Sequence, residues 1–101
     1  MRDIHIAHLD EARPVLVLTR DSVREVLNKV TVAPIKSTIK GLSTEVLLGP
    51  RNGLSHESAV TCDNIMTIDS QLLGRHVGLL FDEQEPQFAR AVMRAFELSL
   101  G

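Results

Sequence analysis

Apolar residues alternate with polar ones in short runs along most of the chain. Ile4 and Ile6 occur at period two and predict a strand over 3–9, which a tight connection at 10–12 joins to an apolar run at 14–18. These two segments predict a β-hairpin. The remaining runs predict strands at 30–35, 44–48 and 76–81, and either one bent strand or two over 58–68.

Other local signals interrupt this β pattern. Apolar residues at helical spacing predict a brief helix over 19–27, with Asp21 or Ser22 as its N-cap. Pro34 has no backbone N–H to donate, which predicts a bulge or a strand edge at that point. The strongest turn signal covers 49–53, where glycine, proline and asparagine gather.

The C-terminal part of the sequence changes to a helical period. From about 84 to 99, apolar residues follow the spacing i, i+3, i+4, i+7 and i+8, which predicts an amphipathic helix. Both Asp82 and Pro86 are suited to the start of that helix. Six or so short strands with such a helix predict a mainly β fold, a small barrel on which the helix lies.

Composition limits the domain organisation. A chain of 101 residues, of which 44% are hydrophobic and 24% charged, predicts a single globular domain over 1–101. The sequence contains no signal peptide and no apolar run of about twenty residues, so we expect a cytoplasmic protein without membrane contact. Cys62 is the only cysteine, which excludes a disulfide framework and a zinc knuckle.

Charge is unevenly distributed along the chain. The formal net charge is -2, yet residues 20–51 contain six Lys or Arg against three acidic residues, while 52–101 contain three Arg against seven acids. A basic segment on an otherwise acidic domain is typical of a protein that holds one short polyanion in one groove. Chance patterning on a solvated surface is the alternative that charge alone leaves open.

A candidate phosphate site follows from two of the predicted strands. Arg13 lies at the start of the buried strand at 14–18, and the strand at 30–35 ends in Lys36, Ser37 and Thr38. A permanent cation facing hydroxyls suits a phosphodiester, although a lone Arg at a strand end is also a common surface residue. On a regular strand Thr38 shares a face with Lys36, and Ser37 does not.

Other chemistry is less well supported. His5 and His8 point to opposite faces of a strand, and His56 and His76 have no adjacent Cys or carboxylate pair at metal spacing, so no metal site is expected. Cys62 lies between apolar residues and is predicted to be a core residue. The absence of Trp and Tyr argues against nucleic-acid modules that stack bases on aromatic side chains.

The combined pattern resembles the MazF/PemK toxins, and most closely the short mycobacterial and actinobacterial MazF proteins. The likeness is carried by the segments at 4–7, 12–16, 30–35, 62–68 and 73–78. It implies an SH3-like barrel of the CcdB/MazF/PemK type with a C-terminal helix, and a homodimer. It also implies the toxin of a type II toxin–antitoxin system: a metal-independent endoribonuclease, without cofactor, that cuts single-stranded RNA at a short sequence and is neutralised by a MazE-like antitoxin.

The resemblance also suggests roles for individual residues. Arg13 matches the catalytic Arg of the family's Arg-Pro pair, and Lys36 stands where the family usually has Thr. The predicted catalytic set is therefore completed by Thr38 and Ser37. Predicted RNA contacts are Arg20 and Lys40 in the basic segment, and Asp63 and Asn64, which match a pair near the bases in relatives or else form a structural turn.

Lys36 leaves two functions open. Either the chain is an active endoribonuclease, with activity reduced or altered by Lys36, or it is a catalytically impaired module that binds RNA or antitoxin on the same scaffold. A third possibility, poisoning of gyrase as in CcdB proteins, is disfavoured because residues 97–101 contain no Trp.

Overall fold

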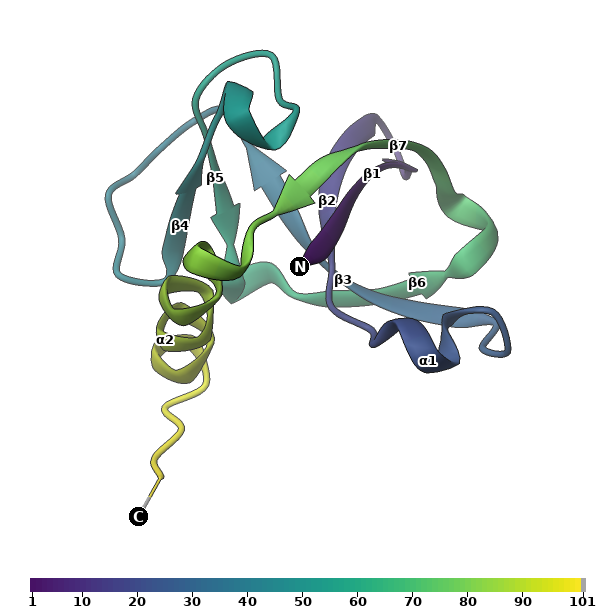
Figure 1. Ribbon diagram of the computed structural model, residues 1–101. Helices are drawn as coiled ribbons and strands as arrows, with labels where there is room; N and C mark the ends of the chain where they lie inside the picture. Colours follow the sequence, from purple (N-terminus) through teal and green to yellow (C-terminus); the bar gives the residue numbers. More distant parts are fainter. Residues whose placement is uncertain (101) are drawn as a thin grey trace.

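A curled antiparallel sheet of seven strands forms the body of the computed structural model, which describes residues 1–100 (Figure 1). Along the sheet the strand order is β4-β5-β3-β2-β1-β7, and β6 pairs with β3 beside this path. The strands are β1 (Arg2–His8), β2 (Ala12–Val17), β3 (Lys29–Lys36), β4 (Glu45–Leu48), β5 (Ser58–Thr61), β6 (Met66–Asp69) and β7 (Leu73–Leu80). The expected mainly β fold is therefore confirmed, as is the hairpin of β1 and β2.

The long strand β3 changes its partner at Pro34. Lys29–Val32 pair with β6, whereas Ile35 and Lys36 pair with β5. Pro34 falls between these two ladders, where no donor is required, and its carbonyl accepts a hydrogen bond from Thr61 Oγ1 at 3.0 Å. Of the two predicted alternatives, a bulge or a strand edge, the structure shows a break between ladders on the side of β5 and β6, while the pairing of β2 with β3 keeps one register up to Pro34.

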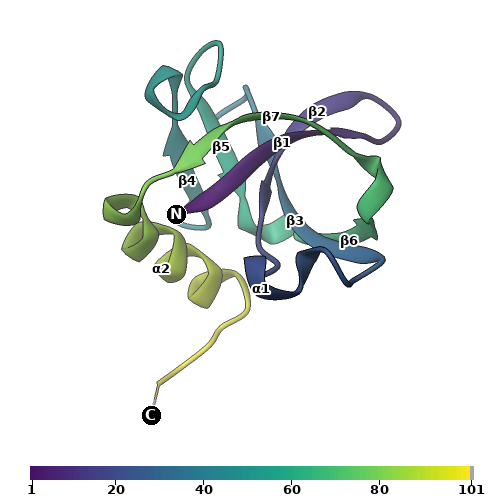
Figure 2. The ribbon, with the colours of Figure 1, turned by 45° about the vertical axis from the view of Figure 1, so that its right-hand side comes forward.

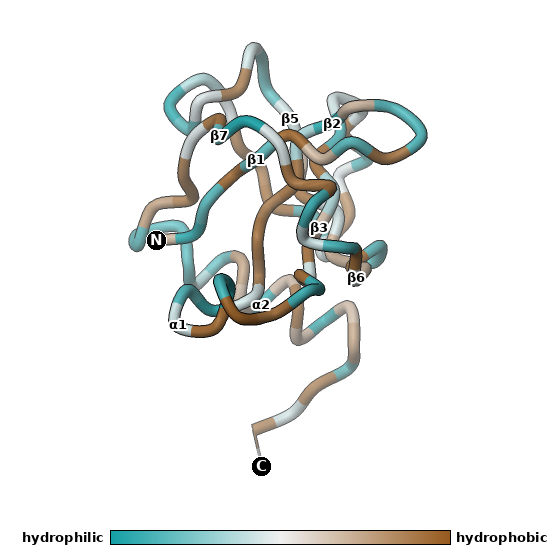
Figure 3. The backbone as a smooth tube through the Cα atoms, turned by 90° about the vertical axis from the view of Figure 1, so that its right-hand side faces the viewer, coloured by the Kyte–Doolittle hydropathy of each residue, from teal (hydrophilic) through white to brown (hydrophobic). Residues whose placement is uncertain are grey.

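Segment 58–68 consists of two strands. A short 3-10 helix, Cys62–Asn64, separates β5 from β6. This break lets β3 pair with β5 at one end and with β6 at the other, which curls the sheet. Apolar and polar residues alternate along β1 in Figure 3, as expected for strands with one face in the core.

The first helix is shorter than the sequence predicts. α1 (Asp21–Arg24) is a single turn whose N-cap is Arg20, without a side-chain cap, so the prediction of Asp21 or Ser22 as N-cap is wrong. The helix takes only part of the connection from β2 to β3, which covers 18–28, and two further backbone bonds extend the turn to Leu27. At 49–53, the predicted turn contains a 3-10 helix, Pro50–Asn52.

The second helix, α2 (Glu85–Ala95), ends earlier than the predicted residue 99. Glu97 adopts a left-handed conformation, with φ 53°, and the Leu98 N–H donates to the Met93 carbonyl at 2.7 Å. This is a Schellman motif, which usually has glycine at that position and terminates a helix. The following segment leads away from the body of the molecule (Figure 2).

The start of α2 lies between the two sequence signals, Asp82 and Pro86, and neither of them is its N-cap, which is Gln84. A 3-10 turn, Asp82–Gln84, leads into the helix, and Pro86 occupies its first turn.

Within residues 1–100, no helix is long and apolar enough to cross a membrane.

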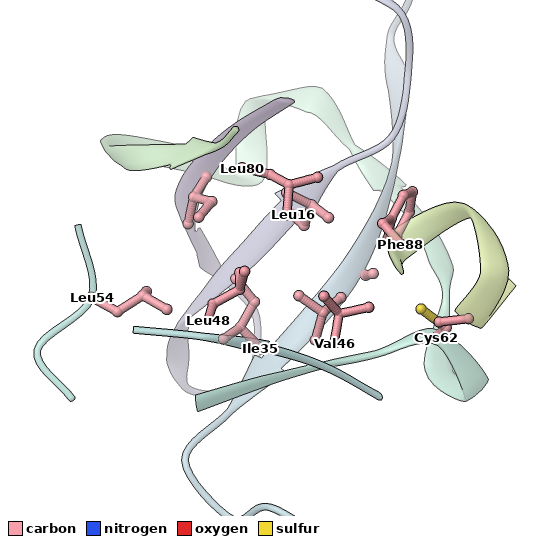
Figure 4. Packing of buried hydrophobic residues seen from close by; sticks show 12 residues of the cluster. Leu16, Ile35, Val46, Leu48, Leu54, Cys62, Leu80 and Phe88 are labelled. Carbon is pink, nitrogen blue, oxygen red and sulfur yellow. The ribbon is translucent and has the colours of Figure 1, made fainter. Parts of the chain in front are cut away.

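Two apolar clusters hold the sheet together. In the larger, Phe88 of α2 packs with Leu16, Ile35 and Leu80 from three strands (Figure 4). The smaller cluster includes Val32 and lies between the β1–β2 hairpin and β6. Because β2 and β3 contribute to both clusters, their ends have fixed positions, and these ends carry the predicted catalytic residues.

Candidate active site

A groove of about 530 Å³ opens beside the ends of β2 and β3. Three cations line it: Arg13 from β2, Lys36 from the last position of β3, and Arg75 from β7. Ser37 and Thr38, in the bend after β3, add two hydroxyl groups. The structure therefore brings together all four residues of the predicted catalytic set, from parts of the chain more than twenty residues apart.

Arg13 is held in the groove wall by its strand. It pairs with Ala7 of β1, and its side chain is 36% exposed. The guanidinium Nη2 lies 3.6 Å from Glu11 Oε2, whereas the Nε atom is buried and has no hydrogen-bond partner among residues 1–100. A buried donor without a partner is energetically costly, and Nε is the one such side-chain atom among the described residues.

The end of β3 sets the geometry of the hydroxyls. β3 stops at Lys36, opposite Ala59 of β5, and the chain bends over Ser37 and Thr38. The expectation that Ser37 faces away from Lys36 and Thr38 holds for a regular strand only, and β3 ends at Lys36, so the alternation does not extend to Ser37 and Thr38. All three residues line the same groove.

Arg75, His56 and Glu11 also line the groove, and the sequence interpretation gave them no role. The sequence did not predict Arg75 as a groove residue, because the predicted strand starts at His76 and leaves Arg75 outside it. In the structure β7 begins at Leu73 and includes Arg75. His56 belongs to the loop before β5, and nothing in the sequence shows that this loop reaches Arg13. Only the alternation along β7, with Arg75 and Val77 on one face, offered a signal.

The four predicted RNA contacts lie outside the groove over the described chain, residues 1–100. Arg20 caps α1, and Lys40 lies in the loop between β3 and β4. Asp63 and Asn64 occupy the 3-10 helix at the far end of β5, where Asp63 Oδ2 accepts a hydrogen bond from Thr44 Oγ1 at 2.5 Å. Their contact with RNA remains a prediction.

Cys62 is a core residue, as predicted. It is fully buried in the larger apolar cluster. Burial, together with the neighbouring Asp63 carboxylate, raises the pKa of its thiol to about 11. Because the reactive species is the thiolate, Cys62 is not a nucleophile at neutral pH.

Cross-strand pairing gives His76 neighbours that its sequence context lacks. His76 stands opposite His5 in the pairing of β7 with β1. Its Nε2 lies 3.0 Å from Asp3 Oδ1, and Arg24 Nη1 lies 2.7 Å from Asp3 Oδ2. This cluster is separate from the groove, since none of its four residues lines it over residues 1–100.

Comparison with known proteins assigns the family. A family model described as PemK-like, MazF-like toxin of type II toxin-antitoxin system matches residues 2–96. The chain belongs to this family. Its expected resemblance to MazF proteins is thereby confirmed, and the curled sheet with a C-terminal helix is the MazF fold.

Two curated relatives from Mycobacterium tuberculosis are named as endoribonucleases. Endoribonuclease MazF3 is 55% identical over 98 residues, which cover 97% of this chain and 95% of that protein. Probable endoribonuclease MazF5 is 35% identical over 89 residues, or 87% of this chain and 78% of that protein. This MazF chain is therefore the toxin of a toxin–antitoxin system and an RNA-cleaving enzyme, and the non-catalytic module is not favoured.

Solved structures agree with this assignment. The M. tuberculosis toxin MazF-mt6 superposes with a TM-score of 0.95 at 54% identity, covering 97% of this chain and 99% of that one. A mycobacterial endoribonuclease in complex with its cognate antitoxin has a TM-score of 0.86 at 22% identity, covering 98% of this chain and 95% of that one, which supports the fold.

Proposed function

We propose that this MazF-family enzyme cuts single-stranded RNA at a short sequence, without metal or cofactor, by attack of a ribose 2'-hydroxyl on the adjacent phosphodiester. The observation that carries the proposal is the groove that the three cations Arg13, Lys36 and Arg75 line together. Such a site favours the negative charge that develops on a phosphoryl group under attack.

Each groove residue has a distinct part in the proposed reaction. Arg13, always protonated and fork-shaped, stabilises the equatorial oxygens of the pentavalent intermediate. Lys36 supplies a second cation, and Thr38 with Ser37 donates hydrogen bonds to the phosphate. Arg is an awkward proton carrier, so His56, the imidazole in the same groove, is the candidate that moves a proton to or from the reacting oxygens.

Lys36 is compatible with activity in this arrangement. Its ammonium replaces the hydroxyl usual at that position with a charge, which keeps the electrostatic contribution and changes the hydrogen-bond geometry. A Lys36→Thr variant separates the two effects. If cleavage rises strongly, the natural chain is impaired by Lys36, and if cleavage falls, Lys36 takes part in it. Lys29→Thr is the matched control, because Lys29 lies at the opposite end of β3 and outside the groove.

The direct test uses a chimeric oligonucleotide. Once the cleaved sequence is mapped on a long mixed RNA, a single deoxyribose at the scissile position removes only the proposed nucleophile. We expect cleavage to stop there completely, and to continue in the all-RNA oligonucleotide in the presence of a chelator. Cutting that persists at the deoxyribose would refute the mechanism, and cutting that ends with the chelator would refute metal independence.

The proposed partners follow from charge and exposed apolar surface. Acidic antitoxin peptides of the MazE type are proposed to bind the basic groove, so their affinity is expected to fall with added salt. A homodimer would cover exposed apolar residues such as Leu47 and Phe96. Arg20, Lys40, Asp63 and Asn64 are proposed to contact RNA beyond the groove. We propose the cytoplasm as the location, because RNA is the substrate.

A further inference from the structure

Three side chains of metal-ligand type converge on β1 and β7. Asp3 and His5 are two residues apart on β1 and therefore share a face, and His76 of β7 stands opposite His5. One ligand atom from each of the three lies within 4.8 Å of the others. The two imidazole rings meet edge to face, with centroids 5.1 Å apart.

This cluster lies on the face of the β1–β7 ribbon that is turned away from the groove. Arg75 and Val77, which flank His76 in the sequence, line the groove, as does Ile6 beside His5. Because successive strand residues point to opposite faces, His5 and His76 point the other way. A ligand bound there does not compete with one in the groove.

The hydrogen bond of His5 prepares its other nitrogen for coordination. His5 Nδ1 lies 3.0 Å from the Gly74 carbonyl oxygen, which can only accept a hydrogen bond. The proton is therefore on Nδ1, and Nε2 keeps its lone pair toward the cluster. A metal-bound histidine typically has its second nitrogen held in this way by a carbonyl or carboxylate.

The Arg24 guanidinium lies where a bound metal cation would lie in this cluster. Its Nη1 lies 2.7 Å from Asp3 Oδ2 and its Nη2 lies 3.5 Å from His5 Nε2. The same Nη1 also lies 3.1 Å from Asp21 Oδ1, on the exposed turn α1. The guanidinium thus has a second carboxylate partner and can leave Asp3 without losing all its ion pairs.

We propose that Asp3, His5 and His76 form a Zn²⁺ site, from which Zn²⁺ displaces the Arg24 guanidinium toward Asp21. Two imidazole nitrogens and a carboxylate oxygen are suitable zinc ligands and leave a fourth position for water. Ligand atoms on one tetrahedral Zn²⁺ are about 3.3 Å apart. Asp3 Oδ1 and His76 Nε2, at 3.0 Å, already have nearly that separation, and Zn²⁺ takes the place of the proton between them, which leaves to solvent or moves to His76 Nδ1. Bound Zn²⁺ would link β1 to β7 on the face of the ribbon opposite Arg75.

Calorimetric titration of the tag-free protein with ZnCl₂ tests this site. We expect one Zn²⁺ per chain, and a loss of affinity of roughly tenfold or more in Asp3→Asn and in His76→Ala. His56→Ala is the matched control, since His56 is an exposed histidine outside the cluster, and it should bind as wild type does. Circular dichroism confirms that each variant is folded.

Arg24→Ala gives a result that no purely structural role of the cluster predicts. Removal of the competing guanidinium should strengthen Zn²⁺ binding, whereas the ligand variants weaken it. Co²⁺ provides a second readout, because its visible absorption on binding should depend on His76. Zn²⁺ affinity unchanged in His76→Ala, or lost in Arg24→Ala, would overturn the proposal. Because the readout is metal binding, failure here leaves the proposed RNA cleavage untouched.

Discussion

Asn52 links three parts of the structure, and its replacement by alanine should be strongly destabilising. The side chain is 1% exposed. Its Oδ1 accepts a hydrogen bond from the Gly49 N–H at 3.1 Å, and its Nδ2 donates to the Leu79 carbonyl and to Gln84 Oε1, each at 2.8 Å. The 3-10 helix at 50–52, β7 and the start of α2 are thus connected through one amide.

The size of the effect follows from these three bonds. At about 1 kcal/mol for each, Asn52→Ala should lower the free energy of unfolding by about 3 kcal/mol. For a domain of this size that lowers Tm by about 10–20 °C. Thermal denaturation followed by circular dichroism measures the shift, with Asn28→Ala as control because Asn28 is exposed. A Tm of Asn52→Ala within about 2 °C of wild type would show that these bonds contribute little.

Three further variants or modifications test other contacts. Gly78→Ala would place a Cβ 1.9 Å from the Asn52 carbonyl oxygen and should cost about 2–3 kcal/mol in urea unfolding, whereas Gly49→Ala, whose nearest neighbour is 3.9 Å away, should cost much less. Cys62, with its thiol pKa raised to about 11 by burial and by Asp63, should resist alkylation at neutral pH until the protein unfolds, and rapid labelling of native protein would contradict this. Backbone N–H groups led by that of Leu42 hold the pKa of Glu45 below its usual value near 4.5, so the ionised side chain stabilises the 40–45 loop above that pH and loses this effect as pH falls through the lowered pKa. Glu45→Gln should therefore show a weaker acid dependence of its urea midpoint than wild type, and equal dependence would contradict the assignment.

The β pattern and the position of Arg13 and Lys36 at strand ends were predictable from the sequence because both depend on local order. Alternation at Ile4 and Ile6, and the apolar runs that follow, identify strands regardless of their partners. Arg13 and Lys36 were found because each adjoins the end of such a run. The sequence alone shows that Pro34 has no backbone N–H to donate. It does not show that Pro34 lies between the pairing of β3 with β6 and that of β3 with β5, because this depends on which strands pair.

What could not be predicted depends on contacts between distant segments or on an unusual local conformation. Glu97 ends α2 in a left-handed conformation that normally indicates glycine, so no sequence signal marked that end. His56 and Arg75 reach the groove only because the loop before β5 and the start of β7 fold beside β2. His76 meets Asp3 through strand pairing, which the spacing between the two residues does not reveal.

Cleavage by an Arg13→Gln variant under single-turnover conditions tests the central claim most directly. Glutamine keeps much of the side chain's length and removes the charge, so the proposed mechanism predicts a rate lower by about 10²- to 10³-fold with an unchanged Tm. Arg90→Gln, at an exposed position on α2, is the matched control and should cleave at the wild-type rate. An Arg13→Gln variant that cuts RNA as fast as the wild-type protein would contradict the proposed role of Arg13 and with it the mechanism.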